Sequence, residues 1–356
     1  MKRVVLCFAL AISSFLLLGP IVFAQQGLTL PRPSQLVSIT QTIGLSTITV
    51  EYSSPSAQGR DLWGQLVPMG QVWRAGANEN TIISFSHDAK VNGSAIKAGT
   101  YGLHAIPGEK EWTIIFSNNS TSWGSFSYDQ KEDALRITTE SREGPQMENL
   151  TFLFGNPSPA SVDVILTWGK KQIPFTVAFD SHEIVLASMR NELRSTPGFT
   201  WVGFQQAANY CLQNEINYEE ALGWINQSIS GGFGAQANFT NLQTKSQLLA
   251  KMGKADESET AMKDALNVGS NMELYQYGAS LIGQNQNEKA LEVFKLNAEK
   301  YPGTWLSHGG LGAGYRVTGN YKEALKHYKK SKESAPSAWV PSIEQRIAQV
   351  EEAMAK

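Results

Sequence analysis

The sequence has few cysteines, and their positions limit what can stabilise the protein. Its 356 residues include two cysteines, Cys7 and Cys211, and Cys7 lies in an apolar N-terminal segment. With a single thiol outside that segment, the rest of the chain cannot form an internal disulfide, so its stability must come from packed cores. The apolar helical pattern around Cys211 predicts a buried, unreactive thiol.

The chain also lacks a strong charge of either sign. It has 30 lysines and arginines against 32 aspartates and glutamates, which gives a formal net charge of −2. Proteins that hold nucleic acid by neutralising phosphates usually carry a basic surplus. The composition therefore argues against a nucleic-acid partner.

Common catalytic and metal-binding motifs are missing as well. No Cys-x-x-Cys, His-Glu-x-x-His or Gly-x-Ser-x-Gly pattern occurs, and no two of the five histidines have metal-ligand spacing. We therefore predict no metal site and no cofactor. Gly310, Gly312 and Gly314 form a glycine-rich run, but no strand precedes it. We interpret this run as a place of close helix packing rather than a phosphate-binding loop.

The N-terminus has the pattern of a secretion signal. Lys2 and Arg3 precede an apolar stretch over residues 4–18, and the segment closes on Val22-Phe23-Ala24. This order predicts a signal peptide over residues 1–24. The apolar run is short for a bilayer core about 30 Å thick, which argues against a permanent anchor. We expect a protein secreted across the inner membrane, periplasmic or extracellular, with no integral membrane span after cleavage.

Residues 25–180 have the alternating pattern of short strands. Strands are predicted over residues 45–52, 81–86, 112–116, 134–138, 150–154, 162–168 and 175–179. Asn92-Gly93 indicates a tight hairpin turn, and further breaks are expected at residues 107–108, 144–145 and 156–157. Many short strands joined by turns predict an antiparallel β-sandwich or barrel-like domain.

After about residue 181 the pattern becomes helical and repeats every 34 residues. Four positions of one unit match the unit before it in residue type: Gly312, Ala324, Tyr328 and Pro336 follow Gly278, Ala290, Phe294 and Pro302. These units resemble tetratricopeptide repeats. We expect a linker helix over 181–200, repeats over 201–336 and a closing helix over 337–356. Ile343, Ile347 and Val350 share one face of the closing helix, which would cover the apolar end of the repeat stack. The predicted fold is thus a multidomain α+β chain that ends in a helical solenoid.

Distinctive segments also run through the β half. They are Pro31–Gln35, Ser54-Pro55, Gly59–Gly64, Leu66–Gly70, Val72–Glu79, Ala98–Gly102, Ile106–Gly108, Trp112-Thr113, Trp123-Gly124, Tyr128-Asp129 and Asp133–Arg136. Together they resemble an uncharacterised bacterial family, the domain of unknown function 2911. The resemblance covers about residues 31–180 and is most specific over residues 73–79. It implies an exported protein and no known reaction.

The segment 73–79 contains the first candidate binding residues. Trp73 could stack on a ligand, Arg74 could pair with an anionic group, and Asn78 and Glu79 could hydrogen-bond it. Alternatively, Arg74 pairs with Glu79 and pins the loop while Trp73 fills the core. Both interpretations remain open at this point.

Three further residues leave similar alternatives. Arg60 and Trp63 could either line a ligand site or stabilise a turn. His104 could be a general base if it shared a cleft with Arg74 and Glu79, or it could be a hydrogen-bonded strand histidine. Small polar residues beside the aromatics of the 118–128 segment could bind a sugar, or could form a solvated loop.

Two functions follow from these features. The first is an exported envelope protein that binds or scaffolds others: its repeat groove would hold a protein or peptide, and its β domain a small molecule, glycan or protein. The alternative is an envelope enzyme with a polar cleft around Arg74, Glu79 and His104. The repeats favour the first function.

Overall fold

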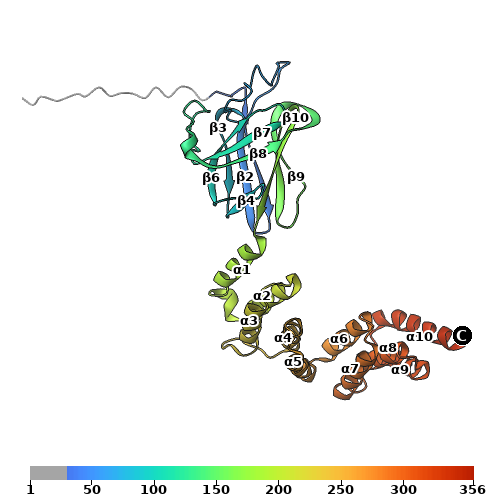
Figure 1. Ribbon diagram of the computed structural model, residues 1–356. Helices are drawn as coiled ribbons and strands as arrows, with labels where there is room; N and C mark the ends of the chain where they lie inside the picture. The colour runs from blue at the N-terminus through green and yellow to red at the C-terminus, as the bar shows by residue number, and fades with distance from the viewer. Residues whose placement is uncertain (1–29) are drawn as a thin grey trace, which may run out of the picture. The chain divides into compact units, whose positions relative to one another are not determined.

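The computed structural model describes residues 30–356, which divide into two compact units on either side of the Ser181–His182 bond. The predicted signal segment 1–24 lies outside the described residues. An antiparallel β unit comes first along the chain and a helical unit second (Figure 1). The predicted fold class is therefore confirmed.

The β unit contains two antiparallel sheets. One has the strand order β1-β2-β3-β6-β7-β8 and the other the order β5-β4-β10-β9. The strands of the first sheet are β1 (Gln35–Ile43), β2 (Ser46–Ser54), β3 (Ala77–Phe85), β6 (Gly99–Ile106), β7 (Glu111–Ser117) and β8 (Asp133–Glu140). Those of the second are β4 (Ala89–Val91), β5 (Ser94–Ile96), β9 (Arg142–Gly155) and β10 (Ser161–Phe179).

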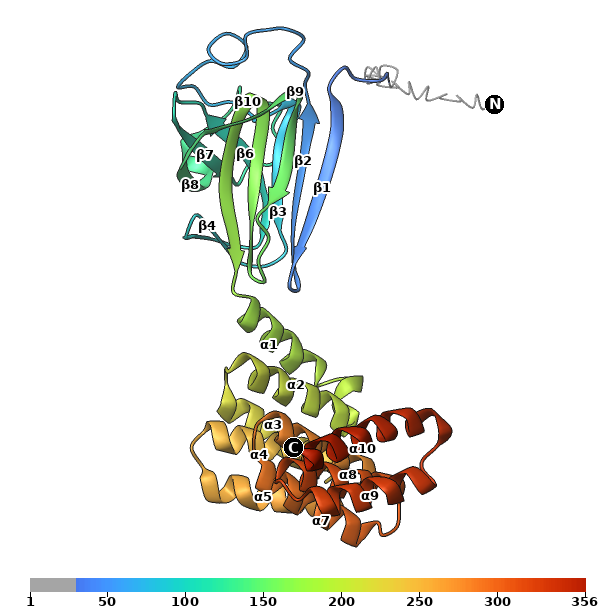
Figure 2. The ribbon, with the colours of Figure 1, turned by 90° about the vertical axis from the view of Figure 1, so that its right-hand side faces the viewer.

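The two sheets share an apolar core. Tyr52 of β2 contacts Phe152 of β9, with ring centroids 4.9 Å apart. Phe116 of β7 contacts Phe175 of β10, with ring centroids 5.8 Å apart. Strands β9 and β10 of the second sheet can be followed along the unit in Figure 2. These rings cover one another because alternate side chains of each strand point to the same face.

Several strand predictions hold and others are wrong. Asn92 and Gly93 have φ values of 45° and 84° and join β4 to β5, as the hairpin signal predicts. The break expected at residues 144–145 is wrong, because Pro145 lies inside β9. The strands expected at 162–168 and 175–179 are one strand, β10, which continues through register shifts around Gly169.

The helical unit contains ten α-helices within the described chain. They are α1 (Ser181–Glu192), α2 (Trp201–Asn214), α3 (Tyr218–Ser230), α4 (Phe239–Lys251), α5 (Ala255–Val268), α6 (Asn271–Gly283), α7 (Asn287–Lys300), α8 (Trp305–Val317), α9 (Tyr321–Ser334) and α10 (Val340–Ala355). Helices α2 to α9 form four hairpins. Between residues 30 and 356, no helix combines the length and the apolarity that crossing a membrane would require.

The helices before and after the four hairpins are packed parts of the array. Leu186 of α1 is buried with Ala208 and Cys211 of α2, so α1 belongs to the core of the first hairpin and is more than a linker. At the other end, Ile343 and Val350 of α10 are buried in the core of the last hairpin. The spacing of these two residues predicts this contact.

Glycines of the first helix of a hairpin contact an aromatic ring of the second helix. A Cβ atom on Gly278 would lie 2.5 Å from Phe294, and one on Gly312 would lie 2.6 Å from Tyr328. These are the positions that repeat at the 34-residue period. Gly310 lies in α8 and also packs on Phe294, which belongs to α7 of the preceding hairpin. The glycine-rich run therefore serves helix packing, as its sequence context predicts.

We expect Gly312→Ala to lower the free energy of unfolding by about 1–3 kcal/mol, because the added methyl group overpacks the contact with Tyr328. The matched control is Gly223→Ala in α3, where a Cβ meets nothing within 4 Å. This control should raise stability by about 0.5–1 kcal/mol, since alanine restricts the unfolded chain. Urea unfolding followed by circular dichroism tests both. Equal effects of the two variants would contradict the packing role.

Candidate functional sites

Four tryptophans of the β unit pack together. Trp63 meets Trp112, Trp168 and Trp73 edge-on at centroid distances of 5.0, 5.9 and 6.0 Å. Trp73 stacks on Trp168 at 6.2 Å. Trp112 and Trp168 are fully buried. Trp63 and Trp73, both candidate ligand-binding residues, thus belong to an aromatic cluster of the core.

The end of the 73–79 segment is fixed by the segment that precedes β1. The guanidinium of Arg32 donates to both carboxylate oxygens of Glu79, at 2.5 and 2.7 Å. This hydrogen bond lowers the pKa of the Glu79 carboxyl. The Asn78 amide donates to the Ser34 carbonyl oxygen at 3.3 Å. The alternative pairing of Arg74 with Glu79 is not formed, because Arg32 occupies that carboxylate.

Arg60 closes its own loop. Its guanidinium donates to the carbonyl oxygens of Ala57 and Ser56, at 2.9 and 2.5 Å. The same loop is held by Glu148, whose carboxylate accepts from Ser56 Oγ and from the Gln58 backbone N–H. These contacts are those of the turn interpretation of Arg60.

Residues 118–132 form a loop that covers the face of the six-stranded sheet opposite the shared core. The backbone N–H of Asn80 donates to the Ser122 carbonyl oxygen at 3.2 Å. The Asn80 side chain lies among carbonyl groups of the same loop. A Cβ atom on Gly102 would lie 2.4 Å from the Asn119 carbonyl oxygen. The loop can therefore lie this close to β6 only where the strand has a glycine.

His104 is enclosed under this loop. It is 2% exposed, and its Nδ1 lies 2.9 Å from Ser125 Oγ. Burial lowers the pKa of His104 to about 4, so the imidazole is neutral at pH 7. The Tyr128 ring lies beside it, with centroids 5.4 Å apart. The Tyr128 hydroxyl donates to the Asp133 carboxylate at 2.9 Å, and Arg136 donates to both Tyr128 and Asp133.

These contacts do not build the cleft of the enzyme alternative. Ser125 and His104 are in contact, as a nucleophile and its base would be, but Asp133 bonds Tyr128 and Arg136 instead of orienting the imidazole. A buried histidine of low pKa is also a poor base at pH 7. Glu79, which the enzyme alternative placed in the same cleft as His104, is paired with Arg32.

The network around His104 includes residues that the sequence did not single out individually. Tyr128, Asp133 and Arg136 lie in segments that carry the family resemblance, which was the available signal for them. Ser125 had no such signal. Cys211 is fully buried, and burial raises the pKa of its thiol to about 11, in line with the predicted unreactive cysteine. Within residues 30–356, no group of three or more His, Cys, Asp or Glu side chains could hold a metal ion.

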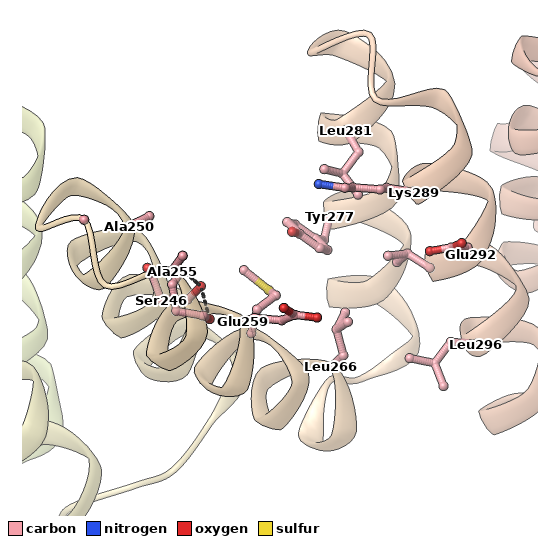
Figure 3. A pocket seen from close by; sticks show the side chains of 14 residues that line it. Ser246, Ala250, Ala255, Glu259, Leu266, Tyr277, Leu281, Lys289, Glu292 and Leu296 are labelled. Carbon is pink, nitrogen blue, oxygen red and sulfur yellow. Dashed lines mark hydrogen bonds between the residues drawn. The ribbon is translucent and has the colours of Figure 1, made fainter.

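The helical unit contains a groove of about 710 Å³ between the α4/α5 and α6/α7 hairpins (Figure 3). Three helices supply its apolar wall residues: Met262 and Leu266 of α5, Tyr277 and Leu281 of α6, and Val293 and Leu296 of α7. Charged side chains of the same lining are Glu259, Lys289 and Glu292. The repeats predicted a groove for a partner, but the sequence did not locate it.

One end of this groove is closed by a joint between the two hairpins. Phe239 of α4, Ala265 of α5 and Leu274 of α6 share a buried cluster. The Lys300 ammonium donates to the carbonyl oxygens of residues 266, 267 and 269, at 3.0, 2.7 and 3.1 Å. A cation on the last carbonyls of α5 satisfies that helix end. From the joint, the groove extends toward Ala250 of α4 (Figure 3).

We expect the β unit to lose stability as the pH falls from about 6.5 toward 4. In this range the unfolded His104 takes up a proton that the buried imidazole, with its pKa of about 4, does not. Once His104 is protonated in both the folded and the unfolded protein, the free energy of unfolding has fallen by about 3 kcal/mol. His104→Phe removes this contribution, so its stability relative to the wild type should improve at pH 4.5 compared with pH 7. Urea unfolding followed by tryptophan fluorescence measures the difference. A difference that does not change with pH would refute the assignment.

No curated protein matches the chain. A tetratricopeptide repeat protein from Parabacteroides merdae is 20% identical, covers 49% of this chain and 67% of its own, and has a TM-score of 0.32. The C-terminal part of a repeat protein from Cytophaga hutchinsonii is 15% identical, with coverages of 49% and 67% and a TM-score of 0.35. YrrB, described as a TPR protein with an unusual peptide-binding site, is 19% identical, with coverages of 46% and 83% and a TM-score of 0.28.

Residues 34–177 match the family model described as a protein of unknown function, DUF2911. This range contains nearly all of the segments that carry the resemblance, together with the tryptophan cluster and the His104 network. The resemblance is confirmed: the DUF2911 family model matches residues 34–177, and tetratricopeptide-like helical repeats follow along the chain.

Proposed function

We propose that the protein is an exported binding protein whose helical repeats hold a segment of a partner protein in the groove between α5 and α6/α7. The observation that carries this proposal is the groove itself. Its volume of about 710 Å³ falls within the range of sites that enclose a ligand, and its walls are apolar. A segment of a few side chains fits a space of this size.

The lining of the groove favours a partner segment of particular chemistry. Met262, Leu266 and Leu296 offer contacts to apolar anchor residues. The Tyr277 hydroxyl points into the groove (Figure 3), and burial raises the pKa of this group, so it remains a hydrogen-bond donor. Two glutamates against one lysine in the lining favour a basic side chain beside the anchors.

Export and a second binding surface complete the proposal. The charged and apolar pattern of residues 2–24 supports secretion to the periplasm or beyond. In the β domain, Trp123 and Phe126 are 57% and 87% exposed. Exposed aromatics on a fixed loop would present a second surface to a small molecule, a glycan or a protein.

Groove variants on α7 test the main proposal. We expect Glu292→Lys and Leu296→Glu to weaken partner binding about tenfold or more, because they alter the charge and the apolar wall of the groove. Glu299→Lys is the matched control on the same helix, and Val268→Glu is the control for a new carboxylate, since neither residue lines the groove. Photo-crosslinking from position 259 in the native cell identifies the partner segment, and titration of that segment gives the affinities.

The controls should bind as the wild type does. If the groove variants keep wild-type affinity, or if removal of residues 201–356 leaves the partner bound, the groove is not the binding site.

A further inference from the structure

Arg74 is a half-buried cation that has no partner among the described residues. Its Nε atom is buried without an acceptor, and no carboxylate lies within ion-pair distance of its guanidinium. Burial, uncompensated by a nearby charge, lowers its pKa. Arg136 and Arg190, by contrast, pair with Asp133 and Glu220. A desolvated charge without a partner costs free energy, which an anion from outside the chain would offset.

The surroundings of Arg74 are held in place by backbone contacts. Gly124 has a φ of 68°, and a Cβ atom at this position would lie 2.5 Å from Arg74 Nη1. The guanidinium therefore lies against the loop where the loop has no side chain. The same Cβ position lies 3.4 Å from Phe126 Cε2, so the exposed Phe126 ring stands beside the cation. On the other side of Gly124 in the chain is Trp123, which is also exposed.

The loop that carries these rings is fixed to the sheet on both sides of the site. Asn80 bonds the Ser122 carbonyl, and His104 bonds the Ser125 hydroxyl. A cation and two aromatic rings on a fixed loop form a surface that needs little ordering before a ligand binds. The cation nearest to the Cβ position of Gly124 is Arg74.

We propose that Arg74, Trp123 and Phe126 bind a sugar acid through its carboxylate. The planar guanidinium presents a pair of N–H donors that matches a carboxylate. Aromatic rings cover the apolar face of a sugar ring. This assignment deepens the proposed second surface of the β domain, and it does not depend on the repeat groove.

The experiment titrates the full chain with methyl glucuronide and follows tryptophan fluorescence and calorimetry. The uncharged methyl glucoside is the control for the carboxylate. We expect the glucuronide to bind about tenfold or more tightly than the glucoside. Arg74→Met should remove this preference, and Arg74→Lys should reduce it, since lysine keeps the charge but loses the paired donors. Trp123→Ala should weaken both sugars, and Arg142→Met, an exposed arginine elsewhere in the domain, should change neither.

A second measurement separates ligand binding from a structural role. Without ligand, Arg74→Met should melt at or above the wild-type temperature, because it removes a cation that no internal group compensates. A lower melting temperature with the glucuronide preference intact would assign Arg74 a structural role instead. Equal binding of glucuronide and glucoside overturns the proposal. So does tighter binding of inorganic phosphate or of an acetylated tripeptide with a free carboxylate. Groove variants that lose their protein partner would leave these results unchanged.

Discussion

Close backbone approach at positions without a Cβ atom is the constraint on which both units depend. In the β unit, Gly102 allows the covering loop to lie on β6. In the helical unit, Gly278 and Gly312 allow the two helices of a hairpin to close on Phe294 and Tyr328. In each case a methyl group would fall inside the contact distance of its neighbour. Close approach of this kind buries the side chains beside it, such as His104 under the covering loop and Phe294 and Tyr328 between the helices.

The same constraint explains where the groove lies. Thr244 and Thr260 stand 34 residues before Gly278 and Phe294, so the α4/α5 hairpin lacks the glycine and ring of the later repeats. Its helices are instead tied by hydrogen bonds between Ser246 and Ser258. The groove lies between this divergent hairpin and the regular one that follows it. Departure from the repeat pattern thus coincides with the space available to a partner.

Local patterns in the sequence were sufficient for much of the fold. Period and turn chemistry predicted β2, the Asn92-Gly93 hairpin and the buried face of α10, because these depend on neighbouring residues. Strand β1 escaped prediction because most of it is exposed, and an exposed strand needs no apolar alternation. The pairing of Glu79 with Arg32, and of His104 with Ser125, joins residues distant in the chain. No spacing rule specifies such partners, so the sequence left both alternatives for Arg74 open.

The structure pairs Glu79 with Arg32 and not with Arg74. Once Arg32 holds Glu79, Arg74 remains a cation pressed against Gly124 without an acceptor for its Nε. The net charge of the whole chain is close to zero, so it does not reveal the unpaired positive charge of Arg74. It also does not reveal the excess of negative charge in the groove, where Glu259 and Glu292 outnumber Lys289. Net charge describes solubility and long-range attraction, whereas recognition depends on charges that are partly desolvated. The two proposed surfaces have opposite local sign, and the proposals accordingly assign them different ligands.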